Sequence, residues 1–277
     1  MRKVRYLALI LVMFFITGLS GCSVLDSALV KLNLRNDDFN YITQSNVSKI
    51  VIQNARDSGF RFIINDTNAI KDIYKVLSKG KVKSEKTDLN PDYIFEVYVG
   101  EEVKSYNYVV SVDERGVGNF YDDNNVYLIS KDLEDTIMNN LSTIRKPKNF
   151  EDIYYDTILE VLKLKKDQLT TSGNSVGVNI SGDVDCLKYM FSVDLKSFES
   201  EMNKVVPGSQ LIENNASEFK TVITVKNRGY STKVFKTTIV VDDKENKSYE
   251  TYYVQGEYEY KSWKITVSDP NTKPDNW

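Results

Sequence analysis

Between residues 219 and 267, apolar and polar residues alternate along four successive runs, and no other feature limits the fold of this chain as strongly. A period of two places every second side chain on the same face of a strand. The intervening segments Asn227-Arg228-Gly229 and Asp242 to Lys247 are rich in turn-forming residues. The pattern predicts a curved antiparallel meander with one buried face. The residues assigned to this pattern are Phe219, Thr221, Ile223, Val225, Phe235, Thr237, Ile239, Val241, Tyr252, Val254, Tyr258, Tyr260, Trp263, Ile265 and Val267.

Two helices are predicted ahead of this meander. The first begins at Phe150, with Asn149 as the expected N-cap and Asp152 at N3 in a variant of the capping box. The second is expected within Asp194 to Val205 and ends at Pro207-Gly208. The apolar stripe of the first helix consists of Phe150, Ile153, Tyr154, Ile158, Val161, Leu162 and Leu164.

An earlier part of the chain shows a similar mixture of strands and helices. Asp66 or Thr67 can cap a helix whose apolar residues follow at helical spacing. Gly100-Glu101-Glu102 separates two strand-like runs and predicts a hairpin. Ser130 can cap a closing helix. The predicted strands are Ser48 to Ile52, Phe60 to Ile64, Tyr93 to Val99, Ser105 to Val112 and Val126 to Ile129.

The two groups of elements predict an α+β fold with two small domains, each an antiparallel sheet packed with one or two helices. Arg145-Lys146-Pro147-Lys148 is a polar break that favours a domain boundary. We expect an N-terminal domain over residues 46–146, a C-terminal domain over 147–268 and a polar tail over 269–277.

Each domain has a resemblance to a known group. The N-terminal one resembles the YhfM-like lipoproteins of Gram-positive bacteria around Asn65 to Ile70, Pro91-Asp92-Tyr93 and Val126 to Ser130. That resemblance implies where the protein is located in the cell, and it implies no particular enzymatic activity. The C-terminal one, roughly residues 149–268, looks like the cone-shaped NTF2-like or cystatin-like fold. Such cones often enclose a pocket between helix and sheet, which some members use for catalysis and many for binding or oligomer contacts.

The N-terminus has the organisation of a signal peptide. Arg2, Lys3 and Arg5 precede the apolar run Tyr6 to Ile16, which is too short to span a bilayer comfortably. Leu19-Ser20-Gly21-Cys22 resembles the lipobox of bacterial lipoproteins, in which the cysteine thiol takes a diacylglycerol. The resemblance implies a signal peptide over 1–21 and lipidation at Cys22. Residues 22–45 are polar and rich in Asn and Asp, and we expect them to form a tether. Each methylene of an acyl chain that is buried in the membrane contributes roughly 0.8 kcal/mol to binding, so two or three chains would give a stable anchor. The alternative is an ordinary signal-anchor helix.

Charge and cysteine content limit the partners, the disulfide bonds and the location that we expect for this chain. The net charge is −3, and cleavage would remove three cationic residues and leave about −6, which disfavours a nucleic-acid partner. With Cys22 lipidated, Cys186 is the one remaining cysteine, so no intrachain disulfide is expected. Cys186 is predicted to be a small buried hydrophobe, with a redox thiol as the alternative. Residue usage favours a Gram-positive source, in which the lipid anchor would hold the protein on the outer, extracytoplasmic face of the cell membrane.

The sequence has no histidine, which excludes histidine-dependent triads, imidazole bases and the usual zinc sites. We therefore predict no catalytic residues, no cofactor and no metal. The acidic segments Asp122 to Asn125 and Asp242 to Asn246 lack EF-hand spacing and are better explained as turns.

One aromatic set could line a pocket in the C-terminal domain and present hydroxyl groups to a glycan or peptide. Its members are Tyr154, Tyr252, Tyr258, Tyr260 and Trp263. Strand alternation explains the same residues as core or sheet surface. The leading hypothesis is therefore a non-enzymatic envelope lipoprotein that binds a protein or cell-wall partner. The alternatives are a small-molecule or histidine-free enzymatic pocket in the C-terminal domain, and a component of a secretion or conjugation assembly.

Overall fold

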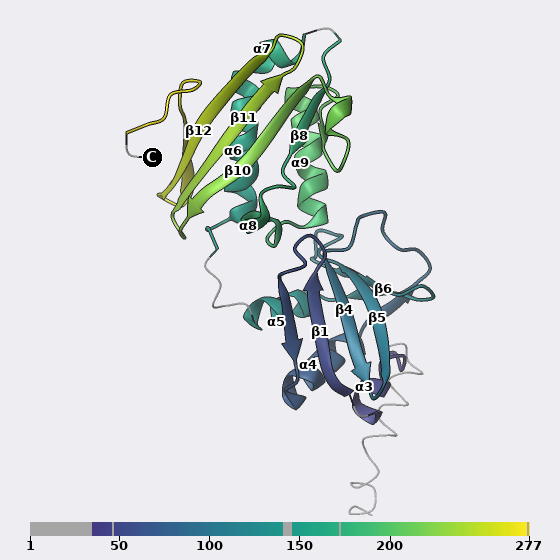
Figure 1. The fold of residues 1–277 in the computed structure, drawn as a ribbon. Coiled ribbons are helices and arrows are strands. Elements are labelled where there is room, and N and C mark those ends of the chain that lie inside the picture. The colour runs from purple at the N-terminus through teal and green to yellow at the C-terminus, as the bar shows by residue number, and fades with distance from the viewer. Residues whose placement is uncertain (1–34, 46, 141–145, 172, 276) are drawn as a thin grey trace, which may run out of the picture. The chain divides into compact units, whose positions relative to one another are not determined.

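The structure is a computed structural model that describes residues 35–45, 47–140, 146–171, 173–275 and 277. It confirms the α+β class (Figure 1). The described chain divides into two compact units. Unit 1 contains the described residues up to Ile52 together with Phe62–Asp88 and Phe95–Thr136, and unit 2 contains Gln53–Arg61, Leu89–Ile94 and Ile137–Trp277. No helix among the described residues is long and apolar enough to cross a membrane.

Unit 1 is built around a seven-stranded sheet with the order β2-β1-β4-β5-β6-β7-β3. The predicted strands and helices are present, and the short helix α3 and the short strands β3 and β6 are additional. The elements are α3 (Tyr41–Gln44), β1 (Val47–Asn54), β2 (Arg61–Ile64), α4 (Thr67–Leu77), β3 (Lys81–Lys83), β4 (Tyr93–Val99), β5 (Glu102–Val109), β6 (Gly118–Tyr121), β7 (Val126–Ile129) and α5 (Asp132–Asn140).

Helix α4 begins as the sequence predicts. The Asp66 carboxylate accepts hydrogen bonds from the backbone N–H groups of Asn68 at 3.0 Å and Ala69 at 2.9 Å. These bonds satisfy two of the donors that every helix start leaves unpaired. The apolar face of α4, with Ile73 and Leu77 almost fully buried, packs into the core.

The segment just before β1 is part of unit 1 and not of a free tether. Phe39 and Ile42 are buried, and the Phe39 ring lies 4.8 Å from the ring of Tyr127 and 5.8 Å from that of Phe120. The expectation of a tether over 22–45 is therefore wrong for residues 35–45, because two large apolar side chains in this short stretch gain more from burial than from solvent exposure.

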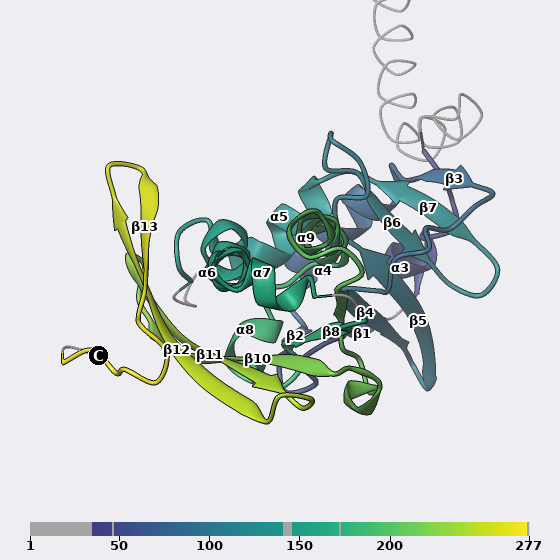
Figure 2. The same ribbon diagram turned by 90° about the horizontal axis from the view of Figure 1, so that it is seen from above.

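Unit 2 contains a curled six-stranded sheet with the order β13-β12-β11-β10-β8-β9. Figure 2 shows this sheet curving around α6. β10 to β13 are antiparallel neighbours, whereas β8 pairs in parallel with β10 and β9. The helices α8 and α9 form the crossover that parallel β8 and β9 require. The elements are α6 (Phe150–Leu164), α7 (Lys166–Leu169), β8 (Val176–Asn179), α8 (Val184–Leu187), α9 (Ser192–Val205), β9 (Gln210–Leu211), a 3₁₀ turn (Ala216–Glu218), β10 (Thr221–Tyr230), β11 (Val234–Asp243), β12 (Ser248–Glu259) and β13 (Ser262–Val267).

The first turn predicted in the meander is a β-bulge. The register of β10 against β11 shifts between Asn227 and Gly229, and Gly229 has a φ of 133°. The side-chain oxygen of Asn227 accepts the Gly229 N–H at 2.9 Å, which stabilises the extra residue. The chain reverses only after Tyr230, where Ser231 N–H bonds to the Val234 carbonyl at 2.8 Å.

Two expectations for α6 are also wrong. Asn149 makes no side-chain cap, because its φ of 45° is left-handed and a capping residue needs an extended backbone. Leu164 is 59% exposed, since it lies in the last turn of the helix. The other residues of the predicted stripe are buried.

The polar tail lies along β12. The backbone N–H of Asn271 bonds to the carbonyl of Thr251 at 2.8 Å, and the Asn271 side chain accepts the Thr251 N–H at 3.0 Å. The Trp277 ring lies 5.3 Å from the ring of Tyr253. Through these contacts the tail packs beside β12 and extends the outer surface of the sheet.

Gly256 lets α6 lie close to β12. A Cβ atom at this position would lie 2.4 Å from Cδ1 of Ile153 and 3.3 Å from the ring of Trp263. Ile153 is fully buried, so it has little space into which it can move.

We predict that Gly256→Ala lowers the free energy of unfolding by about 1–3 kcal/mol, because it overpacks the contact between helix and sheet. Urea unfolding measures this change. Gly182→Ala is the control, since nothing lies within 4 Å of the added Cβ. Equal stability of the two variants would contradict the packing argument.

Candidate functional site

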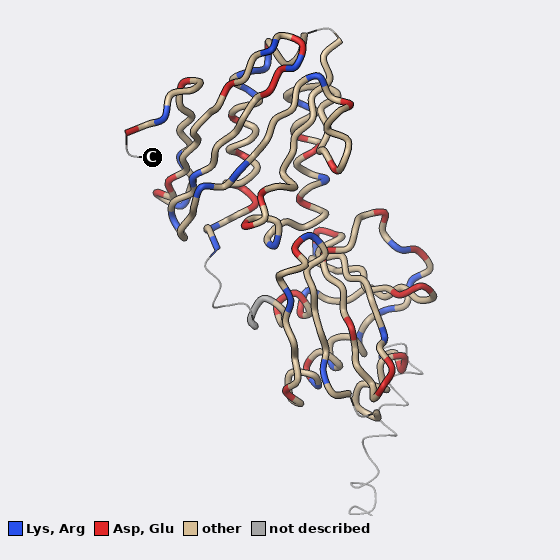
Figure 3. The backbone as a smooth tube through the Cα atoms, in the orientation of Figure 1, with Lys and Arg blue, Asp and Glu red and all other residues tan. Residues whose placement is uncertain are grey.

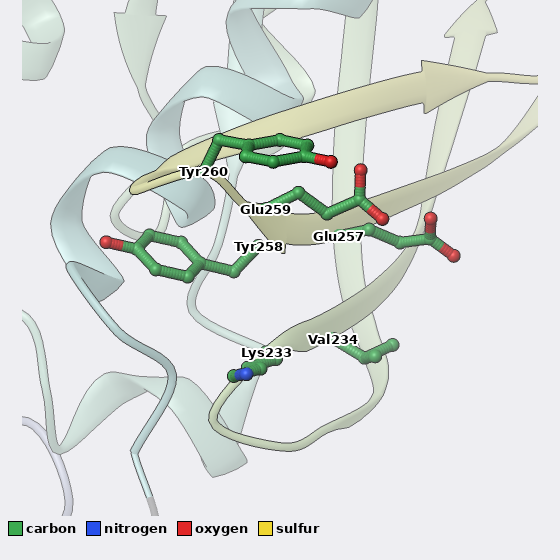
Figure 4. A pocket seen from close by; sticks show the side chains of 6 residues that line it. All are labelled: Lys233, Val234, Glu257, Tyr258, Glu259 and Tyr260. Atoms are coloured by element: carbon green, nitrogen blue, oxygen red, sulfur yellow. The ribbon is translucent and has the colours of Figure 1, made fainter.

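An open surface pocket of 540 Å³ lies at the end of the β12–β13 hairpin, beside the turn between β10 and β11 (Figure 4). The Glu257 and Glu259 side chains point the same way from β12, and Tyr258 points to the other side. The pocket therefore combines two carboxylates, an ammonium group and aromatic rings. Its lining residues are Lys233, Val234, Glu257, Tyr258, Glu259 and Tyr260.

The tip of this hairpin has an unusual backbone. Glu259 pairs with Ser262, which leaves a loop of two residues, Tyr260 and Lys261, with φ values of 49° and 68°. Two positive values define a type I′ turn, which normally selects Asn-Gly or Asp-Gly. A left-handed backbone costs roughly 1–2 kcal/mol for a residue with a Cβ. The Tyr260 side chain is also 99% exposed, so burial does not offset this cost.

Hydrogen bonds and ring contacts hold the walls of the pocket. Ser231 Oγ accepts the N–H groups of Lys233 and Val234, which shapes the β10–β11 turn. The Tyr258 N–H bonds to the Lys233 carbonyl at 2.8 Å, joining the two turns. The Tyr258 ring packs edge-on against the Trp263 ring, with 5.2 Å between the ring centres. These contacts thus connect the β10–β11 turn to the β12–β13 hairpin at the pocket.

Lys148 connects the hairpin to the segment before α6. Its ammonium group lies 5.1 Å from the centre of the Tyr258 ring, and its carbonyl accepts the Trp263 Nε1–H at 2.8 Å. A cation near a ring face is attracted by the negative face of the π system. Tyr258, Tyr260 and Trp263 of the predicted aromatic set are therefore close together at one end of the sheet.

The other two members of the set lie in the core of unit 2. Tyr154 is fully buried and donates to the Asp183 carboxylate at 3.0 Å, and burial raises the pKa of its hydroxyl. Tyr252 is also buried and donates to Glu250 at 2.5 Å. These two tyrosines do not reach the surface pocket.

Glu250 links β12 to the end of α6. It forms an ion pair with Lys165 at 2.8 Å as well as accepting the Tyr252 hydroxyl. Burial alone would raise the pKa of Glu250, but these two hydrogen bonds bring it below its ordinary value. This arrangement fixes the orientation of the helix on the sheet.

Asp183 organises a second buried polar cluster. It accepts the Asn227 N–H at 2.9 Å in addition to the Tyr154 hydroxyl, and burial raises its pKa. The nearby Cys186 is fully buried, and burial raises the pKa of its thiol. These properties are those of a buried hydrophobe rather than a reactive thiol. Cys22 lies outside the described residues.

A network that the sequence did not reveal surrounds the start of α9 in unit 2. Arg56 forms an ion pair with the fully buried carboxylate of Asp92 at 2.8 Å and donates to the Met190 carbonyl and the Ser192 hydroxyl. Asp92 also accepts the Ser192 N–H at 2.7 Å. Asp92 thus caps α9, whose own capping residue Phe191 has no side-chain acceptor.

The two acidic segments form turns. Asp122 accepts the N–H groups of Asn124 and Asn125, and Asp243 accepts the N–H of Asn246. These are the Asx-turn bonds expected for such sequences. Within the described ranges, no three Asp, Glu, Cys or His side chains are grouped so that they could hold a metal ion.

These observations define a two-unit α+β protein with a surface pocket on its second sheet. Residues 43–147 match the sequence model of the family described as YhfM protein, a stretch shorter than half of the chain. This match confirms the predicted resemblance for the N-terminal part. No curated protein and no solved structure matches the chain.

The carboxylate of Asp194, in the first turn of α9, gives the structure a specific pH dependence. Burial raises its pKa to about 6, the charges of Glu151 and Asp92 add to this shift, and Lys146 and the Phe191 N–H oppose it. The folded state therefore binds a proton more tightly than the unfolded state. This contribution to stability is present near pH 4 and is lost as the pH rises through about 6.

We predict that Asp194→Asn removes this dependence. Wild-type protein should lose on the order of 1 kcal/mol relative to the variant between pH 4 and 7, after discounting for solvent screening. Urea unfolding over this pH range measures the difference. Asp167→Asn makes the same charge change at an exposed position and is the control. Parallel wild-type and Asp194→Asn profiles would rule the effect out.

Proposed function

We propose that this chain is an envelope lipoprotein, anchored through Cys22 on the outer face of the cell membrane of a Gram-positive bacterium, and that it binds a cell-wall glycan or protein partner. The lipobox-like sequence Leu19-Ser20-Gly21-Cys22 supports the anchor. The family match over residues 43–147 supports the same cellular setting through the resemblance stated above. The binding role rests on the hairpin tip of unit 2.

One observation carries the binding role: Tyr260 is almost fully exposed in a left-handed turn position that a tyrosine rarely occupies. Neither the stability of the turn nor burial favours tyrosine there. Strained backbone that the surrounding structure holds in place is often found at binding sites. Beside it, Glu257 and Glu259 can accept hydrogen bonds from sugar hydroxyls or peptide N–H groups.

Binding without catalysis is the form of activity that we propose. For Tyr154 and Tyr252 the sequence left open a pocket lining or a place in the core, and both lie in the hydrophobic core between α6 and the sheet. Both side chains are almost fully buried there. The surface pocket, by contrast, is open to solvent.

The anchor predicts a specific modification. Wild-type chain expressed in a Gram-positive host should incorporate an alkyne-labelled fatty acid, and Cys22→Ala should not, because the diacylglycerol is attached to that thiol. Gel fluorescence after coupling a dye to the alkyne measures the incorporation. Cys186→Ala alters the other cysteine and should keep the label. Label retained by Cys22→Ala, or missing from wild type, would refute the anchor.

We predict that substitutions at the hairpin tip change the stability of the fold and the binding of the partner in opposite directions. The double variant Tyr260→Asn with Lys261→Gly should raise the free energy of unfolding by about 1 kcal/mol, because both residues suit a type I′ turn. It should also weaken co-sedimentation with isolated cell-wall sacculi at least tenfold, or about 1.4 kcal/mol, since an exposed aromatic contact is lost.

Tyr249→Asn is the matched control for this experiment. Tyr249 belongs to the same strand β12, is 63% exposed and lies at the end remote from the tip. Its replacement should leave sacculus binding unchanged. If the double variant binds as well as wild type, the tip is not the binding site.

A further inference from the structure

A basic strip runs along the edge of unit 1. Five of the twelve residues from 75 to 86 are lysine, and Glu85 is the one acidic residue among them. Lys79, Lys81 and Lys83 are exposed, and so is Val82, with 64% of its surface accessible. Val82 is thus an exposed aliphatic side chain flanked by lysines, on a chain whose net charge is negative. We call residues 79–83 the basic strip.

The strip coincides with the short strand β3. This strand ends the sheet order and pairs with β7, Lys81 opposite Leu128 and Lys83 opposite Val126. Figure 2 shows β3 at the margin of its sheet. Side chains on both faces of an edge strand can approach the same surface when the sheet meets it edge-on. The lysines and Val82 can therefore act together.

The first described residues of the chain are bound directly beside the strip. The backbone N–H of Asn36 bonds to the Ser78 carbonyl at 2.8 Å, and its side-chain amide donates to the carbonyls of Leu77 at 3.0 Å and Gly80 at 2.7 Å. Arg35 donates to the Ser78 hydroxyl at 3.2 Å and lies over the Tyr74 ring at 5.2 Å. The chain from Cys22 therefore joins unit 1 next to residues 79–83.

The length of that connection limits how far the strip can be from a lipid anchor. Thirteen peptide units separate Cys22 from Arg35. Full extension would span at most about 45 Å, and a flexible coil of this length would average about 20 Å between its ends. A cation acts over a distance of about 8 Å at physiological ionic strength. A connection of this length allows the strip to come within that distance of the membrane that holds the anchor.

We propose that the basic strip binds the anionic phospholipid surface of the membrane that holds the anchor. This inference rests on the lipid anchor of the proposed function. Lysines near an anionic membrane are attracted to its surface potential, and Val82 can insert among the headgroups. The overall negative charge of the rest of the protein is repelled by the same surface, so the strip turns toward the membrane. Charges of both signs are spread along the backbone of both units (Figure 3).

The test uses the full lipidated chain, reconstituted into vesicles of phosphatidylcholine alone or of equal parts phosphatidylcholine and phosphatidylglycerol. Hydrogen–deuterium exchange followed by mass spectrometry reports on peptides covering residues 77–86. We expect these amides to exchange at least fivefold more slowly on the anionic vesicles. The protection should disappear at roughly 1 M salt, where the screening length is about 3 Å.

A triple variant and a matched control test whether the lysines of the basic strip cause this protection. Lys79→Glu, Lys81→Glu and Lys83→Glu together should abolish the protection. Lys204→Glu, Lys264→Glu and Lys273→Glu make the same charge change at exposed positions of unit 2 and should preserve it. Equal exchange on neutral and anionic vesicles, or equal protection in the triple variant, would overturn the proposal.

The same experiment distinguishes failure of the proposed lipid anchor from failure of the basic strip. If the chain carries no lipid, it will not remain with phosphatidylcholine vesicles, and the proposed anchor fails. Binding of the unlipidated full chain to the anionic vesicles then tests the strip by co-sedimentation. Since each lysine near the surface strengthens binding about fivefold and each glutamate is repelled, the triple variant should bind at least about a hundredfold more weakly. Equal binding of wild type and triple variant would refute the strip.

Discussion

The packing of α6 into the concave face of the second sheet is the contact on which unit 2 depends. Ile153, Tyr154 and Ile158 are fully buried against β11 and β12. Gly256 permits this approach because it has no Cβ, and the ion pair between Lys165 and Glu250 fixes the far end of the helix. The curled hairpin β12–β13 is held in place by the same contact, so the position of the surface pocket follows from the core.

Buried polar groups determine the details around this core. Asp183 joins Tyr154 to the bulge at Asn227, and Asp92 caps α9 while paired with Arg56. A buried carboxylate is costly unless it is fully hydrogen-bonded. Each of these two aspartates accepts at least two hydrogen bonds, so they select one arrangement of loops and helix starts rather than adding greatly to stability.

Two surface features have no explanation in the stability of the fold. Tyr260 occupies a left-handed turn position without burial, and Val82 is exposed between lysines on an edge strand. The first suggests a contact with a partner in the cell wall and the second a contact with lipid. They lie in different units, so the variants proposed for one leave the other unaltered.

The sequence alone predicted the α+β class and most of the strands, because alternation and helical spacing are local consequences of which side chains avoid water. It also limited the cap of α4 to Asp66 or Thr67, and the structure has Asp66, whose bonds involve neighbouring residues. It misplaced the turn after β10, the cap at Asn149 and the start of unit 1, since those depend on backbone angles and on distant rings. Within the aromatic set, alternation placed Tyr252 and Tyr260 on one face, but the pairing of Glu259 with Ser262 put Tyr260 in the turn. Only tertiary structure could separate the buried tyrosines from the exposed one, because the end of a hairpin is decided by register between strands and not by the composition of either strand.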